Sequence, residues 1–107
     1  MAKPYRVQLS RKAGWRRPDN TVVVGRPTAW GNPFPIGKVG RDEAIRRFRA
    51  MLESPAEMAN WLYPPLSEIR RKLRGKNLAC WCRLDEPCHA DILLEIANAP
   101  EGEGHES

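Results

Sequence analysis

The sequence of 107 residues lacks any long hydrophobic run. No stretch of about 18 consecutive apolar residues occurs, so no transmembrane helix is predicted. The first six residues also lack the apolar stretch of a secretory signal, and we therefore expect a cytoplasmic protein without a membrane partner. The length suits one domain, which we predict to span residues 1–99 and to be followed by a disordered acidic tail at 100–107.

Cysteine is scarce: there are three, an odd number, and all lie between positions 80 and 88. A secreted disulfide scaffold usually spreads an even number of cysteines along its chain, so that class is not predicted. Clustering beside His89 instead indicates a metal site or a reactive thiol. The G-x-G-x-x-G and P-loop patterns are absent as well, so no standard cradle for a dinucleotide or a triphosphate is predicted.

Acidic residues are outnumbered, because 18 Lys and Arg face 13 Asp and Glu and give a formal net charge of +5. Two basic groups stand out, at positions 11–17 and 70–76. A basic balance permits binding to phosphates or nucleic acid but does not require it, since solvated basic faces are common. Trp15, beside Arg16 and Arg17, adds an aromatic ring of the kind that engages single-stranded nucleic acid.

Hydrophobic periodicity and turn residues predict three short strands and four helices. The strands are expected at 5–9, 21–24 and 76–82, and the helices at 42–53, 56–62, 65–73 and 89–98. The apolar run at 21–24 is typical of a strand covered on both faces. Three prolines within 26–35 require a shaped loop there, which we expect to continue to Gly40. The β-β-loop-α-α-β-α order predicts an α/β fold: a small sandwich with a short, partly parallel sheet packed by helices.

The stretch that holds the three cysteines is the first candidate for chemistry. It leaves the end of the third predicted strand and enters the last helix, and ligands of open α/β folds bind at such an edge. A zinc site with Cys80, Cys82, Cys88 and His89 as ligands is the first hypothesis. The number and type of these ligands suit tetrahedral zinc, although their spacing departs from the usual C-x2-4-C pattern.

Two other hypotheses stay open for the same stretch. Cys88 would be a catalytic thiol if the helix N-terminus stabilised its thiolate and His89 assisted. Asp91, one turn into the helix, would then orient a histidine or bind a ribose hydroxyl. In the structural hypothesis, the cysteines are buried thiols and the histidine caps the helix.

The proline-rich loop that follows the second predicted strand is the second candidate. Arg26 can hold a phosphate or carboxylate, Trp30 can stack on a flat ring, and Gly31 allows close approach of a ligand. Asn32 offers both a donor and an acceptor to a base or sugar. The alternative is a stiff turn whose aromatic rings fill the core. Lys76 is a further candidate ligand for phosphate, weighed against a solvated lysine.

Four stretches resemble the domain of unknown function 4326 family. They are RVQLSR at 6–11, RP with WGNPF within 26–34, LRGKNLACWC at 73–82 and CHAD at 88–91. The resemblance covers about residues 5–98 and implies a bacterial or phage origin. It implies that the proline-rich loop and the cysteine stretch belong to one site, but it implies no particular reaction.

These observations predict a small nucleotide- or nucleoside-binding or -processing protein. In this hypothesis Arg26 and the N-terminus of the last helix hold an anion, Trp30 stacks on a base, and Cys88 or His89 is the reactive or metal-binding group. The alternative is a zinc-stabilised, non-catalytic module that binds nucleic acid or another partner. Zinc is thus the candidate cofactor, and a nucleotide-like molecule or nucleic acid is the candidate partner. The sequence determines neither the reaction nor the oligomeric state.

Overall fold

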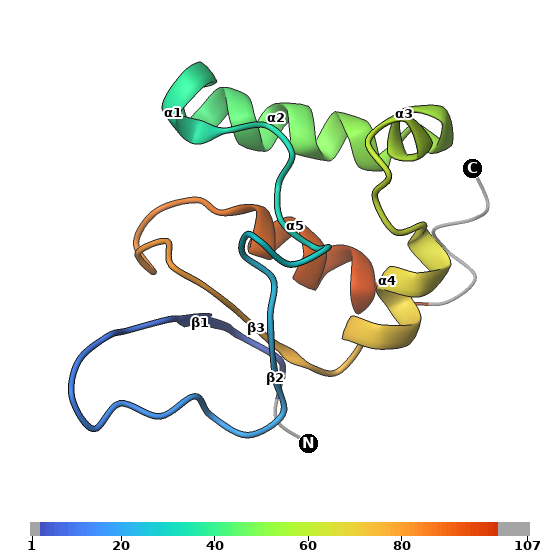
Figure 1. Ribbon diagram of the computed structural model, residues 1–107. Helices are drawn as coiled ribbons and strands as arrows, with labels where there is room; N and C mark the ends of the chain where they lie inside the picture. The colour runs from blue at the N-terminus through green and yellow to red at the C-terminus, as the bar shows by residue number, and fades with distance from the viewer. Residues whose placement is uncertain (1–2, 101–107) are drawn as a thin grey trace.

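The structure is a computed structural model that describes residues 3–100, so the predicted tail lies, beyond Pro100, outside the described residues. Three strands and five helices occur in this part of the chain (Figure 1). They are β1 (Arg6–Gln8), β2 (Thr21–Val23), α1 (Ile36–Val39), α2 (Arg41–Leu52), α3 (Pro55–Asn60), α4 (Leu66–Leu73), β3 (Asn77–Cys80) and α5 (His89–Ala97). The predicted α/β class is therefore confirmed. No helix within residues 3–100 is long and apolar enough to cross a membrane.

The strands form one sheet in the order β1-β3-β2. β3 pairs in parallel with both neighbours, and Gln8 lies opposite Cys80 while Val23 lies opposite Ala79. Within the described residues the sheet is thus wholly parallel, where the sequence predicts partial parallel pairing. Because the strands share one direction and register, their carboxyl ends meet at a single edge.

The central position in the sheet belongs to β3, whose four residues are all buried. The prediction that the run at 21–24 is covered on both faces was wrong for β2, which lies at the edge of the sheet and is only half-buried. Val24, one residue beyond β2, is fully buried. An apolar run indicates burial, but it does not reveal which of two apolar strands lies in the middle.

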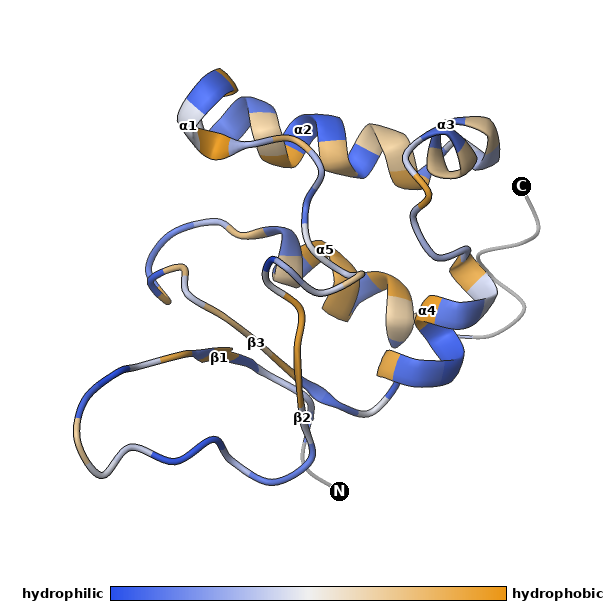
Figure 2. Ribbon diagram, in the orientation of Figure 1, coloured by the Kyte–Doolittle hydropathy of each residue, from blue (hydrophilic) through white to orange (hydrophobic). Residues whose placement is uncertain are grey.

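The core lies between the sheet and the helices. α5 packs against β1, β3, α2 and α4, and Figure 1 shows it between the sheet and α2. Phe48 of α2, Leu78 of β3 and Leu93 of α5 are fully buried in this layer. Figure 2 shows the same division, with hydrophobic residues along the strands and α5 and a hydrophilic loop between β1 and β2.

Two local predictions need correction. Residues 36–39 form the single turn of α1 rather than a continued loop, because the N–H groups of Lys38 and Val39 donate to the Pro35 carbonyl. This turn ends at Gly40, whose φ of 88° suits glycine. Pro65 precedes α4 in an extended conformation instead of occupying its first helical position.

Candidate metal centre

The three cysteines come together at the carboxyl edge of the sheet. Cys80 is the last residue of β3, Cys82 follows two residues later, and Cys88 directly precedes α5. Their Sγ atoms all lie within 4.8 Å of one another, and those of Cys80 and Cys88 are 2.9 Å apart. All three thiols are free. They are therefore close enough to hold one metal ion.

An ion pair across the sheet fixes the end of the segment between β3 and α5. The Asp91 carboxylate accepts from the backbone N–H of Cys88 at 3.1 Å and pairs with the Arg6 guanidinium of β1 at 3.0 Å. Arg6 also donates to the Arg83 carbonyl at 2.6 Å. Asp91 thus holds the first turn of α5 and already places a negative charge there. An anion at this helix end would meet that charge, contrary to the role expected from the sequence.

His89 is held in one tautomer by the backbone. Its Nε2 lies 2.9 Å from the Val24 carbonyl oxygen, which can only accept, so Nε2 carries the hydrogen. Nδ1 is left as an acceptor, 3.6 Å from the Sγ of Cys88. The ring is buried and packs edge-on against Phe48, with 5.3 Å between centroids. Among residues 3–100, the set whose ligand atoms all lie within 4.8 Å contains the cysteines without His89.

The three thiols differ in the direction in which the protein shifts their pKa values. The hydrogen bond between Cys80 and Cys88 lowers the pKa of Cys80 and, together with burial, raises the pKa of Cys88 to about 11. Burial also raises the pKa of Cys82. The pKa is thus raised for Cys82 and Cys88 and lowered for Cys80. The raised pKa of Cys88 does not suit an isolated nucleophile, because the thiolate is the reactive form.

Arg41 completes the surroundings of the thiols. This first residue of α2 donates from Nη1 to Cys82 Sγ at 3.5 Å and to the Pro87 carbonyl at 3.0 Å. Its Nη2 lies 3.1 Å from Glu86. The hydrogen bond to Cys82 raises the pKa of Arg41, so the guanidinium stays charged beside the sulfurs. Sequence reasoning missed this residue, because nothing near it in the sequence indicates that α2 begins beside the cysteine segment.

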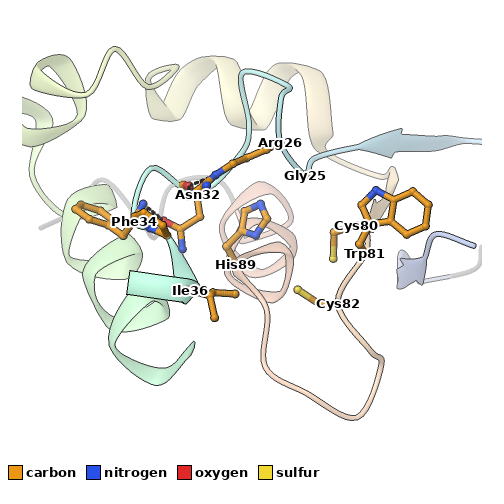
Figure 3. Close-up of a pocket in the computed structure, with 11 residues that line it drawn as sticks. Gly25, Arg26, Asn32, Phe34, Ile36, Cys80, Trp81, Cys82 and His89 are labelled. Carbon is orange, nitrogen blue, oxygen red and sulfur yellow. Dashed lines mark hydrogen bonds between the residues drawn. The ribbon is translucent and has the colours of Figure 1, made fainter. Parts of the chain in front are cut away.

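A pocket of about 380 Å³ opens onto the cluster. Gly25 and Arg26, residues 32 and 34–37, residues 80–82 and His89 line it, and Figure 3 shows His89 between Asn32 and the two cysteines Cys80 and Cys82. This volume lies at the small end of the range for ligand pockets, about 300–1,000 Å³. Trp81 belongs to the lining and was not among the predicted site residues, since alternation along an extended strand sends it to the face opposite Cys80.

The polar groups of the proline-rich loop largely serve the loop itself. Nε and Nη2 of Arg26 donate to the Asn32 carbonyl at 3.0 and 2.8 Å. The Asn32 side chain donates to the Ala44 carbonyl of α2 at 3.1 Å and accepts from the Phe34 N–H at 2.9 Å. A Cβ at Gly31 would lie 2.9 Å from Cγ of Arg26. The space beside this glycine is therefore taken by the Arg26 side chain of the same loop.

Trp30 and Lys76 are not brought to the pocket. Trp30 packs edge-on against Tyr63, with 6.4 Å between centroids, and its carbonyl accepts from the Tyr63 hydroxyl at 2.7 Å. Lys76 precedes β3 and therefore lies at the opposite edge of the sheet from Cys80. Of the predicted ligand-binding residues, Arg26 and Asn32 line the pocket together with Cys80, Cys82 and His89.

The fold and the site define a small parallel α/β domain with a thiol cluster, able to hold a metal ion, at the carboxyl edge of its sheet. The chain matches the family described as domain of unknown function (DUF4326) over residues 7–99 and belongs to it, which confirms the resemblance seen in the sequence. No curated protein and no solved structure matches the chain.

Proposed function

We propose that this protein holds zinc on Cys80, Cys82 and Cys88 and binds a nucleoside or nucleotide in the adjoining pocket. The proposal is carried by one observation, three Sγ atoms within 4.8 Å of one another beside a pocket. Thiolates are soft ligands that suit zinc, and the three residues match the number of protein ligands in sites that leave a fourth position for water or substrate.

The charges around the cluster fit such a centre. Three thiolates and one Zn²⁺ carry a net charge of −1, which the Arg41 guanidinium beside Cys82 offsets. Zinc bound there would supply Lewis-acid chemistry, polarising an oxygen of the ligand or activating water. His89 Nδ1, held as an acceptor by the contact of Nε2 with Val24, would hold a proton released next to the metal.

The pocket lining supports a flat, oxygen-bearing ligand. Within residues 3–100, Arg26 makes no ion pair, and its hydrogen bonds to Asn32 use Nε and Nη2, which leaves Nη1 for a ligand oxygen. Trp81 is a lining residue that is 47% exposed, and Figure 3 shows its ring on the side of Cys80 that faces away from Asn32 and His89. In this proposal Trp81 takes the stacking role that the sequence suggests for Trp30.

A closed, purely structural zinc centre is the second candidate. His89 Nδ1 lies 3.6 Å from Cys88 Sγ, while Nε2 contacts a backbone carbonyl, as metal-bound histidines commonly do. A small shift of the ring would make His89 the fourth ligand. This candidate predicts zinc without an exchangeable position, and therefore zinc without a bound ligand.

Metal content tests the thiol cluster directly. We expect about one zinc per chain in protein purified without a histidine tag, and Cys82→Ser should abolish it. Cys82 is the least buried of the three cysteines, so this change disturbs the core least. Lys76→Ala, at the opposite edge of the sheet, is the matched control and should retain the metal. Metal-free protein whose three thiols titrate as reduced would overturn the proposal.

Cobalt substitution separates the open from the closed centre. With an open position, a nucleoside or nucleotide should shift the visible bands of the Co²⁺ protein, and His89→Ala should leave the metal bound. Trp81→Ala should weaken the ligand-induced shift at least fivefold, since stacking on an aromatic ring is worth about 1–3 kcal/mol. Loss of cobalt in His89→Ala, together with bands that no ligand moves, would favour the closed centre instead.

A further inference from the structure

Residues 10–20, within the loop between β1 and β2, form a basic and exposed segment that the metal site does not use. It contains four basic residues and one acidic residue, Asp19. Every residue from 11 to 17 is exposed, and no helix or strand occurs in the loop. Figure 1 shows the loop as a wide excursion beside the sheet, away from the helices, and Figure 2 shows it as strongly hydrophilic. We call it the basic loop.

The cations of the basic loop are unpaired. Within residues 3–100 none of them makes an ion pair; they are Arg11, Lys12, Arg16 and Arg17. The helices treat their basic residues differently, because Arg46 and Arg47 pair with Glu43 of the same helix. These helix cations thus have an acidic partner, whereas the cations of the basic loop face solvent without one.

Aromatic rings accompany these cations. Trp15 is 36% exposed at the turn of the basic loop, where its backbone N–H donates to the Lys12 carbonyl at 3.0 Å. The Arg11 guanidinium lies 4.4 Å from the ring centroid of Trp81, which is 47% exposed. Since Trp81 also lines the pocket beside the thiol cluster, it joins the basic loop to the pocket rim.

Exposed tryptophans beside unpaired cations are complementary to single-stranded nucleic acid. Each phosphate can meet a cation, and each unstacked base can lie on an aromatic face, whereas a duplex hides the faces of its bases. We propose that a single strand of RNA or DNA runs along the basic loop, stacks on Trp15 and Trp81, and presents one nucleotide to the pocket. This inference rests on the proposed function and narrows its ligand from a free nucleotide to a nucleotide within a strand.

Binding of labelled oligonucleotides to the zinc-loaded protein tests the inference. An oligomer of about 12 nucleotides, near the upper end of common site sizes, should bind tightly at low salt, and a blunt duplex should bind at least tenfold more weakly. The logarithm of the binding constant should fall with the logarithm of salt concentration with a slope of about −3, from four phosphates at about 0.7 each. Separate RNA and DNA oligomers identify the preferred strand.

A pair of charge variants provides the sharpest control. Replacing Arg11, Lys12, Arg16 and Arg17 with glutamine should weaken binding at least tenfold and flatten the salt slope. The control replaces four paired cations of the helices with glutamine and so removes the same charge; these are Arg46, Arg47, Arg71 and Lys72. Equal losses in the two variants would show a general charge effect and would overturn the inference.

Tryptophan variants test stacking separately from charge. Trp15→Ala and Trp81→Ala should each weaken binding about fivefold or more, whereas Tyr5→Ala, which also removes an exposed aromatic ring but lies outside the loop and pocket, should not. All three residues are exposed, so the variants should fold. Unchanged binding in both loop-side variants would contradict the inference, as would equal binding of the duplex.

The remaining outcomes separate this inference from the proposed function. Zinc-dependent binding of free nucleotides, with oligomers binding no tighter, would support the proposed function. It would contradict the inference that the ligand is a nucleotide within a strand. Oligomer binding with the expected slope in Cys82→Ser protein, without binding of free nucleotides, would keep the strand surface and overturn the zinc site. Preferential binding to vesicles of phosphatidylcholine and phosphatidylserine would assign the basic loop to a membrane surface instead.

Discussion

The proline-rich loop and the cysteine segment meet at the same edge of the sheet, but their polar groups face different partners. In the loop, the Asn32 amide and two nitrogens of Arg26 are used by neighbouring backbone groups. In the cysteine segment, the thiols and His89 Nδ1 face one another. The loop therefore builds the wall of the pocket, whereas the cysteine segment contributes thiols that are close enough to hold a metal ion. Both segments have a distinctive composition. Only their hydrogen bonds show that the polar groups of the loop bind its own backbone and α2, whereas the thiols contact one another.

The largest expected effect breaks the loop without touching the cluster. Asn32→Ala removes a buried side chain, 8% exposed, that satisfies the Ala44 carbonyl and the Phe34 N–H. The free energy of unfolding should fall by about 2–4 kcal/mol, because two groups lose their partners. Urea unfolding of the two proteins measures this. The folded variant should still hold zinc, and a loss of metal with unchanged stability would reverse the roles given to the two segments.

A second change weakens the cluster without touching the loop. Arg41→Gln removes the guanidinium beside Cys82, and the affinity for zinc should fall about 10- to 100-fold, as for other residues that support metal ligands. Competition with a coloured chelator measures the affinity. Arg46→Gln, in the same helix but paired with Glu43, should leave it unchanged. Equal affinities in the two variants would mean that Arg41 contributes nothing to the centre.

The smallest expected effect tests whether Trp30 has a structural role only. Tyr63→Phe deletes the hydroxyl that donates to the Trp30 carbonyl at 2.7 Å and should lower the free energy of unfolding by about 1 kcal/mol. Tyr5→Phe is the control, because that ring is 51% exposed, and thermal melting of both variants should separate them. Ligand binding should not change in either variant. A weaker ligand-induced shift in Tyr63→Phe would bring Trp30 back into the site.

Much of the fold was predictable because its signals are local. The apolar face of α2 and the turn residues around β2 lie within a few positions of one another, and the corresponding elements were predicted to within a few residues. The cysteine cluster could also be predicted from the sequence, since its members lie within nine positions of one another. A metal set spread over distant segments would have left no such signal.

The rest depended on contacts between distant segments. Arg41 reaches Cys82 only because α2 begins beside the segment that follows β3. Asn32 has the same donor and acceptor whether it binds a ligand or its own chain, so its type does not reveal its role. The order β1-β3-β2 is likewise a property of the whole chain, and the apolar runs that form β2 and β3 do not state which lies between the others.

The central position of β3 has a consequence for how the chain reaches its native state. Neither β1 nor β2 pairs with the other; Arg6 lies opposite Leu78, and Thr21 lies opposite Asn77. Both outer strands therefore pair only with a strand that lies more than fifty residues later in the chain. Pairing over such sequence separations is slow. A nascent chain that stops before residue 77 has no sheet to form. The thiol cluster depends on the same pairing, because Cys80 is the last residue of β3.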